Sequence, residues 1–323
     1  MQIPYTASNF DFSQYVMLKH NGTLVCGWPD LLWAAITVGR SGWDKVLQHG
    51  LYSYFEMTYR GTMLLANLVE ETSPSLLDFE RNIYRSPAFD DLDPSEKSAV
   101  SYFIGLAMAK LFAEEYFGVS WLIHFAKYTG SYTLIGSKRP DLIGFKGNDD
   151  WIVIEAKGRT NNIAAGELEH AKQQVLSLAM IDEQNPILRA VVAGSFPKRY
   201  LTVTLDDPEH DKETKTSLKL DPDQFVRDYY RPFIDLVEHS DRTGEYLIKD
   251  WRFITVQLEE LDIEVGVNKE VLFLWREFYE QELPRKRLGF LYGKQKPIPG
   301  ERDRGRIYVG NDGIIVKLGD SWK

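Results

Sequence analysis

The chain has 323 residues, of which 44% are hydrophobic, and a formal net charge of −9. This length and hydrophobic content predict a globular protein with one large or two modest domains, and the acidic charge argues against a chain that coats nucleic acid with its whole surface. The apolar runs are too short to span a bilayer, the N-terminus lacks a signal-peptide pattern, and the single cysteine, Cys26, excludes an internal disulfide. We therefore expect a cytoplasmic protein.

Residues 28–90 carry apolar side chains mostly at three- and four-residue spacing, which predicts a helical N-terminal region over residues 1–94. The next helix has Pro94 and Ser95 as start signals and Gly118 as a stop signal. After it we expect strands at 120–128, 139–146 and 151–158, a helix at 164–182 and a strand at 187–196. These elements follow the order α-β-β-β-α-β, and we assign them to one domain over residues 95–205.

The remaining part, 206–323, has a mixed pattern. Its segments predict a helix at 221–239, a strand at 252–260, a helix at 267–281 and a hairpin at 306–318, with a turn at Asn311-Asp312-Gly313. The whole chain is thus expected to be α/β (α+β), with a mixed central sheet flanked by helices.

Residues 284–306 form a basic segment, with eight basic and two acidic residues and interleaved aromatic residues. Its charge of +6 leaves −15 for the rest of the chain. Such a segment is typical of a surface that contacts phosphates, with Arg285, Lys286 and Arg287 as candidate contacts beside Lys138 and Arg139. A solvated charge run on a hairpin is the alternative.

The strand at 151–158 ends with two ionisable residues after an apolar run. Side chains alternate along a strand, so Glu155 and Lys157 project from the same face. The preceding strand offers Asp141 directly after Pro140. A three-residue loop at 147–149 would place Asp141 opposite Glu155, whereas a two-residue loop would pair it with Ala156 and direct the carboxylate to the other face.

Two carboxylates that converge in this way repel each other unless a cation lies between them, and oxygen ligands suit Mg²⁺ or Mn²⁺. An ammonium group beside them can orient an attacking water or neutralise charge on a phosphate. Asp141, Glu155 and Lys157 therefore indicate metal-assisted hydrolysis of phosphodiester bonds.

Pro140-Asp141 and Glu155-Ala156-Lys157, on consecutive strands between two helices, resemble the PD-(D/E)XK nuclease superfamily, which has the restriction-endonuclease-like fold. The resemblance covers about a third of the chain. It implies that Asp141, Glu155 and the backbone carbonyl of Ala156 bind Mg²⁺ or Mn²⁺ and that Lys157 orients the attacking water.

Many members of that superfamily also place a glutamine on the helix after the second motif and an acidic residue on the first helix. Helical spacing directs Gln174 inward and leaves Gln173 on the flank, so we expect Gln174 to be the matching residue; a glutamine that only covers the core edge is the alternative. Glu96, at the start of the first helix, is the candidate additional acid.

The catalytic residues have structural alternatives as well. Glu155 and Lys157 could form an ion pair at a solvated strand end, and Asp141 could be a turn residue at a strand start. The six histidines show no metal-ligand spacing, and His124 is expected in the core or at a strand edge.

The leading functional hypothesis is a Mg²⁺-dependent endonuclease that acts on DNA, as in restriction or anti-phage defence. The resemblance leaves open a homo-oligomer or a partner protein in a defence complex. The alternatives are a nuclease-fold subunit that mainly binds DNA or assembles with a protein, with weak or regulated activity, and a nuclease that cleaves RNA.

Overall fold

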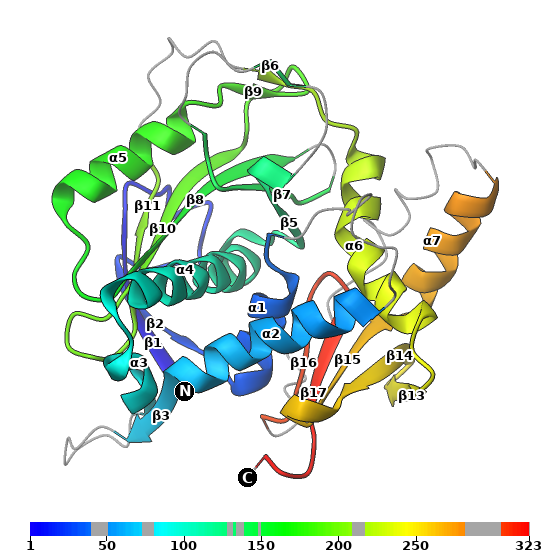
Figure 1. Cartoon of the computed structure of the whole chain (residues 1–323). Helices are drawn as coiled ribbons and strands as arrows, with labels where there is room; N and C mark the ends of the chain where they lie inside the picture. Colours follow the sequence, from blue (N-terminus) through cyan, green and yellow to red (C-terminus); the bar gives the residue numbers. More distant parts are fainter. Residues whose placement is uncertain are drawn as a thin grey trace.

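The computed structural model describes residues 1–39, 51–72, 81–127, 132–133, 139–147, 150–208, 217–281 and 305–322. In this part of the chain the structure is mixed α and β. Figure 1 shows a large sheet crossed by the long helix α4 (Pro94–Phe117), with a smaller sheet next to α6 (Pro222–Glu238) and α7 (Lys269–Gln281). None of the described helices is long and apolar enough to cross a membrane.

The large sheet has the strand order β3-β4-β1-β11-β10-β8-β7-β5, and β2 pairs with β1. Its mixed character is clear from the pairing, because β8 is parallel to β10 while β7 is antiparallel to both β8 and β5. The strands are β1 (Gln2–Ser8), β2 (Asn21–Val25), β3 (Leu68–Thr72), β4 (Arg81–Arg85), β5 (Trp121–His124), β7 (Leu142–Phe145), β8 (Trp151–Arg159), β10 (Leu188–Ser195) and β11 (Thr202–Asp206).

The other elements form two smaller sheets and the remaining helices. A second sheet has the order β13-β14-β15-β17-β16, and a third consists of three two-residue strands in the order β6-β12-β9. The remaining helices are α1 (Trp28–Thr37), α2 (Leu51–Asn67), α3 (Pro87–Asp91) and α5 (Ala165–Leu176). The remaining strands are β6 (Tyr132–Thr133), β9 (Met180–Ile181), β12 (Ser217–Leu218), β13 (Thr243–Ile248), β14 (Trp251–Leu258), β15 (Ile263–Asn268), β16 (Ile307–Val309) and β17 (Ile314–Leu318).

The predicted order α-β-β-β-α-β is present as α4, β5, β7, β8, α5 and β10, with the short β6 and β9 inserted. The capping residues of helix α4 explain where it begins and where it ends. The Asp93 carboxylate accepts from the N–H groups of Ser95 and Glu96, the Glu96 carboxylate accepts from Asp93 N–H, and Gly118 adopts the left-handed conformation with φ of 67°. Helix α5 is shorter than predicted, because Met180 and Ile181 pair with β12 instead of continuing the helix.

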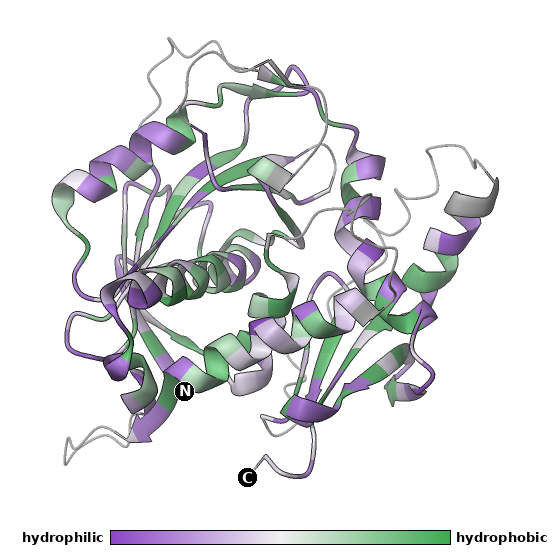
Figure 2. Ribbon diagram, in the orientation of Figure 1, coloured by the Kyte–Doolittle hydropathy of each residue, from purple (hydrophilic) through white to green (hydrophobic). Residues whose placement is uncertain are grey.

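Helices α4 and α5 cover opposite faces of β8. A Cβ on Gly158 would lie 1.6 Å from the carbonyl oxygen of Ser101, so α4 packs directly on the backbone of this strand. One residue earlier, the side chain of Lys157 reaches the other face, where it contacts Gln174 of α5. With both faces covered, β8 and β10 can be apolar almost throughout, and Figure 2 shows hydrophobic residues along α4 and the central strands.

The prediction of a helical N-terminal region is wrong for four segments. Residues 2–8, 21–25, 68–72 and 81–85 are strands, and all four belong to the large sheet. Strand β1 pairs in parallel with β11, with Tyr5 opposite Val203. This pairing joins segments about 200 residues apart, which local periodicity does not reveal. Residues 1–94 thus extend the central sheet as well as providing helices.

In the C-terminal part, the predicted helices are α6 and α7, the predicted strand is β14, and the predicted hairpin consists of β16 and β17. The hairpin closes at the predicted turn, where Gly313 N–H donates to the Gly310 carbonyl over 2.9 Å. Strands β13 and β15 were not predicted. They complete the second sheet on either side of β14.

Candidate functional site

The candidate site lies at the edge of the sheet where β5 ends, β7 begins and β8 continues. Leu142 is opposite Ile154 and Phe145 is opposite Trp151, so the same register places Asp141 opposite Glu155. This is the register expected from an odd-numbered loop, and it is confirmed. The turn is closed by Asp150 N–H, which donates to the Gly147 carbonyl over 2.9 Å.

We call Asp141 and Glu155 the carboxylate pair. The carboxylate of each residue accepts a hydrogen bond from a backbone N–H of the other residue's strand. The Asp141 N–H donates to Glu155 Oε2 over 3.0 Å, and the Ala156 N–H donates to Asp141 Oδ2 over 3.2 Å. The backbone N–H and C=O of one strand residue point to the same side, so the Ala156 carbonyl faces the same gap. Pro140 is opposite Ala156 in this register and has no N–H to offer that carbonyl.

Lys157 and Gln174 extend the site on the side of α5. Lys157 Nζ donates to Glu155 Oε1, and it donates to Gln174 Oε1 over 2.9 Å. Gln174 Nε2 in turn donates to the Arg139 carbonyl over 3.1 Å. Helix α5 therefore brings Gln174 to the motif lysine, as the helical spacing predicted. Its catalytic role stays a prediction.

The electrostatics of the carboxylate pair favour a bound cation. The Glu155 side chain is fully buried. Burial raises the pKa of Glu155 to about 8, with a further contribution from the negative charge of Asp141, although Lys157 opposes the rise. Burial likewise raises the pKa of Asp141, again against the ammonium of Lys157. A surface ion pair at a solvated strand end would show neither the burial nor the raised pKa.

The donors at the pair fit a magnesium ion. In the described part of the chain, no three His, Cys, Asp or Glu side chains gather as a metal site. A cation at the pair would thus bind two carboxylates and a backbone carbonyl, with the remaining positions left to water or a phosphate. Mg²⁺ is commonly held by one or two carboxylates together with waters and substrate phosphates, which matches this set.

Two of the other predicted site residues, Glu96 and Arg139, lie in the part of the chain that the structure describes. The Glu96 carboxylate closes the capping box of α4 and is exposed. It lies five residues, or about 7.5 Å along the helix axis, before Ser101, which packs on Gly158 of β8. Arg139 is exposed next to Pro140, whereas Lys138, Arg285, Lys286 and Arg287 lie outside the described residues.

Sequence reasoning missed two residues next to the pair, Tyr102 and His124. Tyr102 Oη lies 3.0 Å from His124 Nε2. His124 is the last residue of β5, and the next N–H, of Phe125, donates to the Asp141 carbonyl over 2.8 Å. Burial raises the pKa of the Tyr102 phenol, and the charges of Asp141 and Glu155 raise it further. His124 was expected only as a core or strand-edge residue, because nothing in the local pattern connects it with Tyr102.

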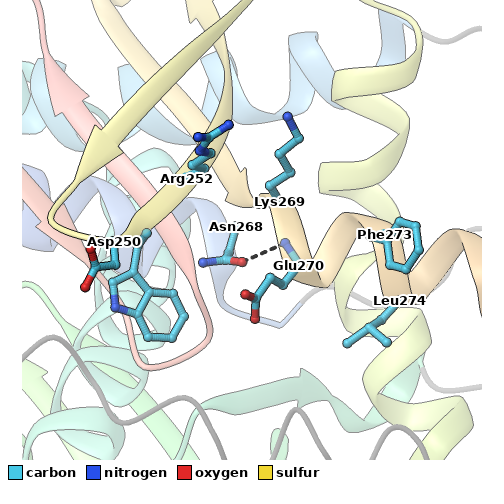
Figure 3. Close-up of a pocket in the computed structure, with 8 residues that line it drawn as sticks. Asp250, Arg252, Asn268, Lys269, Glu270, Phe273 and Leu274 are labelled. Atoms are coloured by element: carbon cyan, nitrogen blue, oxygen red, sulfur yellow. Dashed lines mark hydrogen bonds between the residues drawn. The ribbon is translucent and has the colours of Figure 1, made fainter.

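A pocket of about 790 Å³ lies elsewhere, between β14, the end of β15 and the start of α7 (Figure 3). Asn268 Oδ1 caps α7 there by accepting from Glu270 N–H over 2.8 Å. The lining carries both acidic and basic side chains, Asp250 and Glu270 with Arg252 and Lys269, and so favours no one class of ligand. The carboxylate pair, where the buried Glu155, the partly buried Asp141 and Lys157 converge, therefore remains the candidate site.

No protein-family model matches the chain, and neither a curated protein nor a solved structure matches it.

Proposed function

We propose that the protein is a metal-dependent nuclease that hydrolyses phosphodiester bonds of DNA, and that α4, β5, β7, β8, α5 and β10 form a restriction-endonuclease-like core. The observation that carries the proposal is the register of β7 and β8, which brings Asp141 opposite Glu155 while Lys157 and Gln174 meet beside them. This geometry supports the PD-(D/E)XK resemblance because the motif residues, distant by 14 positions, converge in one gap.

Asp141, Glu155 and the Ala156 carbonyl would hold Mg²⁺ or Mn²⁺. When bound, the ion supplies positive charge that stabilises the phosphate oxygens as negative charge develops on them. Lys157 would orient the water whose oxygen attacks phosphorus, while the bond from phosphorus to the leaving ester oxygen breaks. Gln174 accepts from Lys157 and bonds the Arg139 backbone, so it would fix the direction of the ammonium.

DNA is proposed over RNA on the strength of the resemblance, since hydrolysis of either backbone needs the same groups. A DNA-binding or assembly subunit with weak activity is the second candidate. The mutual hydrogen bonds of the four site residues and the full burial of Glu155 argue for an active nuclease, because burying an acid is costly where no function requires it.

The test is incubation of the purified protein with plasmid, linear duplex, single-stranded DNA and RNA, each with Mg²⁺, Mn²⁺ or EDTA. We expect cleavage of DNA with either metal and none with EDTA. Asp141→Asn and Glu155→Gln should abolish cleavage and weaken Mg²⁺ binding, measured by calorimetry, whereas Lys157→Ala should abolish cleavage and retain Mg²⁺ binding. Gln174→Ala should slow cleavage by less than Lys157→Ala does.

Lys172→Ala is the matched control, because Lys172 lies on α5 close to Gln174 but pairs with Glu169 and with Asp206 of β11. It should cleave at the wild-type rate. Wild-type rates in the Asp141, Glu155 and Lys157 variants would exclude this site. Cleavage of RNA alone would show that the substrate is RNA and not DNA.

A further inference from the structure

The Tyr102–His124 contact lies on the face of the sheet opposite Lys157 and Gln174. His124 is paired with Leu142, and Leu142 with Ile154, so these three side chains point to the α4 face of the sheet. Lys157 leaves β8 on the α5 face. Glu155 leaves β8 on the same face as Lys157, and its Oε2 accepts from the Asp141 N–H. The carboxylate pair therefore borders the gap in the sheet beyond the end of β5 and the start of β7. A phosphate in that gap would therefore have α5 residues on one side and α4 residues on the other.

The hydrogen bonds of His124 determine its tautomer. The Ala126 N–H donates to His124 Nδ1 over 3.3 Å, so that nitrogen acts as an acceptor and carries no proton. The remaining proton of a neutral imidazole is then on Nε2, which donates to Tyr102 Oη over 3.0 Å. Because the phenol oxygen accepts this bond, its own O–H is directed elsewhere.

The backbone at Tyr102 is held in place, whereas the residue remains accessible. Tyr102 follows Ser101, whose carbonyl is in van der Waals range of the Gly158 backbone. Helix α4 therefore cannot shift along β8 at this point. The residue is still 39% exposed. An anchored backbone, an oriented phenol and an open side are the features expected of a group that donates to a bound substrate.

We propose that Tyr102 is a further catalytic residue, which donates a hydrogen bond from its phenol to a non-bridging oxygen of the scissile phosphodiester, and that His124 is a positioning residue that orients the phenol. This inference rests on the proposed nuclease function. It adds a donor on the α4 face to Lys157 on the α5 face, so that the phosphate is contacted from both sides of the sheet.

The test compares four variants with the wild type. It measures kcat and KM for DNA cleavage and the melting temperature of each protein. Tyr102→Phe should lower kcat by about 100-fold, as expected for loss of one preorganised donor to developing charge, with little change in KM or melting temperature. His124→Ala should do the same, and His124→Gln should recover most of the rate, because the glutamine amide can supply the N–H of Nε2. Tyr102→Phe combined with His124→Ala should be no slower than either alone, since His124 acts through Tyr102.

Tyr116→Phe is the control on the same helix. Tyr116 packs against Tyr5 and Phe112, 14 residues from Tyr102, and its variant should keep the wild-type kcat. An active wild-type protein with an equally active Tyr102→Phe variant would overturn this inference alone, as would losses that multiply in the double variant. A wild-type protein that cleaves no nucleic acid would overturn the proposed function as well.

Discussion

Glu155 is fully buried, and the folded protein stabilises the negative charge of its carboxylate only in part. Lys157 donates to one carboxylate oxygen and the Asp141 N–H to the other, yet burial and the neighbouring Asp141 still raise the Glu155 pKa to about 8. The cost of this arrangement in the absence of metal is explained if the site is built for a cation, since metal binding uses the deprotonated acids.

The raised pKa of Glu155 predicts a stability that depends on pH. Between the ordinary pKa of 4.5 and about 8, the folded state retains a proton that the unfolded chain has released. Folding therefore binds protons in this window, and the contribution of Glu155 to the free energy of unfolding falls as pH rises through it. Compared with the wild type in EDTA, Glu155→Gln should become relatively more stable as the pH rises from about 5 to about 8.

Urea unfolding of both proteins at several pH values measures this difference. Glu114, whose pKa is also raised to about 8 by burial, remains in both proteins and cancels in the comparison. Saturating Mg²⁺ should reverse the trend in the wild type only, because the ion binds the deprotonated carboxylates. Stability curves that run parallel in EDTA would contradict the raised pKa.

At the scale of elements, the site depends on the close approach of α4 to β8. Gly105 and Gly158 bring the two backbones together, since a Cβ on Gly105 would lie 2.5 Å from the Lys157 carbonyl oxygen. Both glycines are near the motif residues. Their lack of side chains lets the helix that carries Tyr102 lie directly on the strand that carries Glu155 and Lys157.

Gly158→Ala should therefore destabilise the protein by several kcal/mol and reduce cleavage, because a methyl group 1.6 Å from the Ser101 carbonyl oxygen must push α4 off the sheet. Gly166→Ala is the matched control. A Cβ at Gly166 of α5 meets nothing within 4 Å, and alanine in a helix should stabilise by about 0.5–1 kcal/mol. Thermal unfolding and cleavage assays measure both, and a Gly158→Ala variant as stable as the wild type would refute the packing argument.

At the scale of the whole molecule, a buried polar network joins the large sheet region to the C-terminal hairpin. Lys110 of α4 is fully buried, 3.8 Å from Asp312 and 3.9 Å from Glu114. Asp312 accepts from the Trp33 indole over 3.2 Å and from the Tyr229 hydroxyl. Its position was predicted only as a turn. The turn in fact supplies a buried carboxylate that receives bonds from α1 and α6 and faces the ammonium of α4.

Asp312→Ala should cost about 3–5 kcal/mol of unfolding free energy, because it leaves the buried Lys110 without one of its charge partners and several donors without an acceptor. A residue that only shaped the turn would cost far less. Asp320→Ala, at a fully exposed carboxylate in the same C-terminal segment, should change stability by less than about 0.5 kcal/mol. Urea unfolding measures both, and equal stabilities for the two variants would show that the network contributes nothing.

The sequence by itself determined the order α4-β5-β7-β8-α5-β10 and the inward direction of Gln174, and it limited the partner of Asp141 to Glu155 or Ala156. These follow from local rules, because caps, alternation along a strand, the length of a turn and helical spacing involve neighbours in the chain. Only the tertiary structure decided that β1 to β4 join the central sheet, that Tyr102 meets His124 and that Asp312 faces Lys110. These contacts connect residues 22 to about 200 positions apart, and they depend on which faces pack together, a choice that no local pattern encodes.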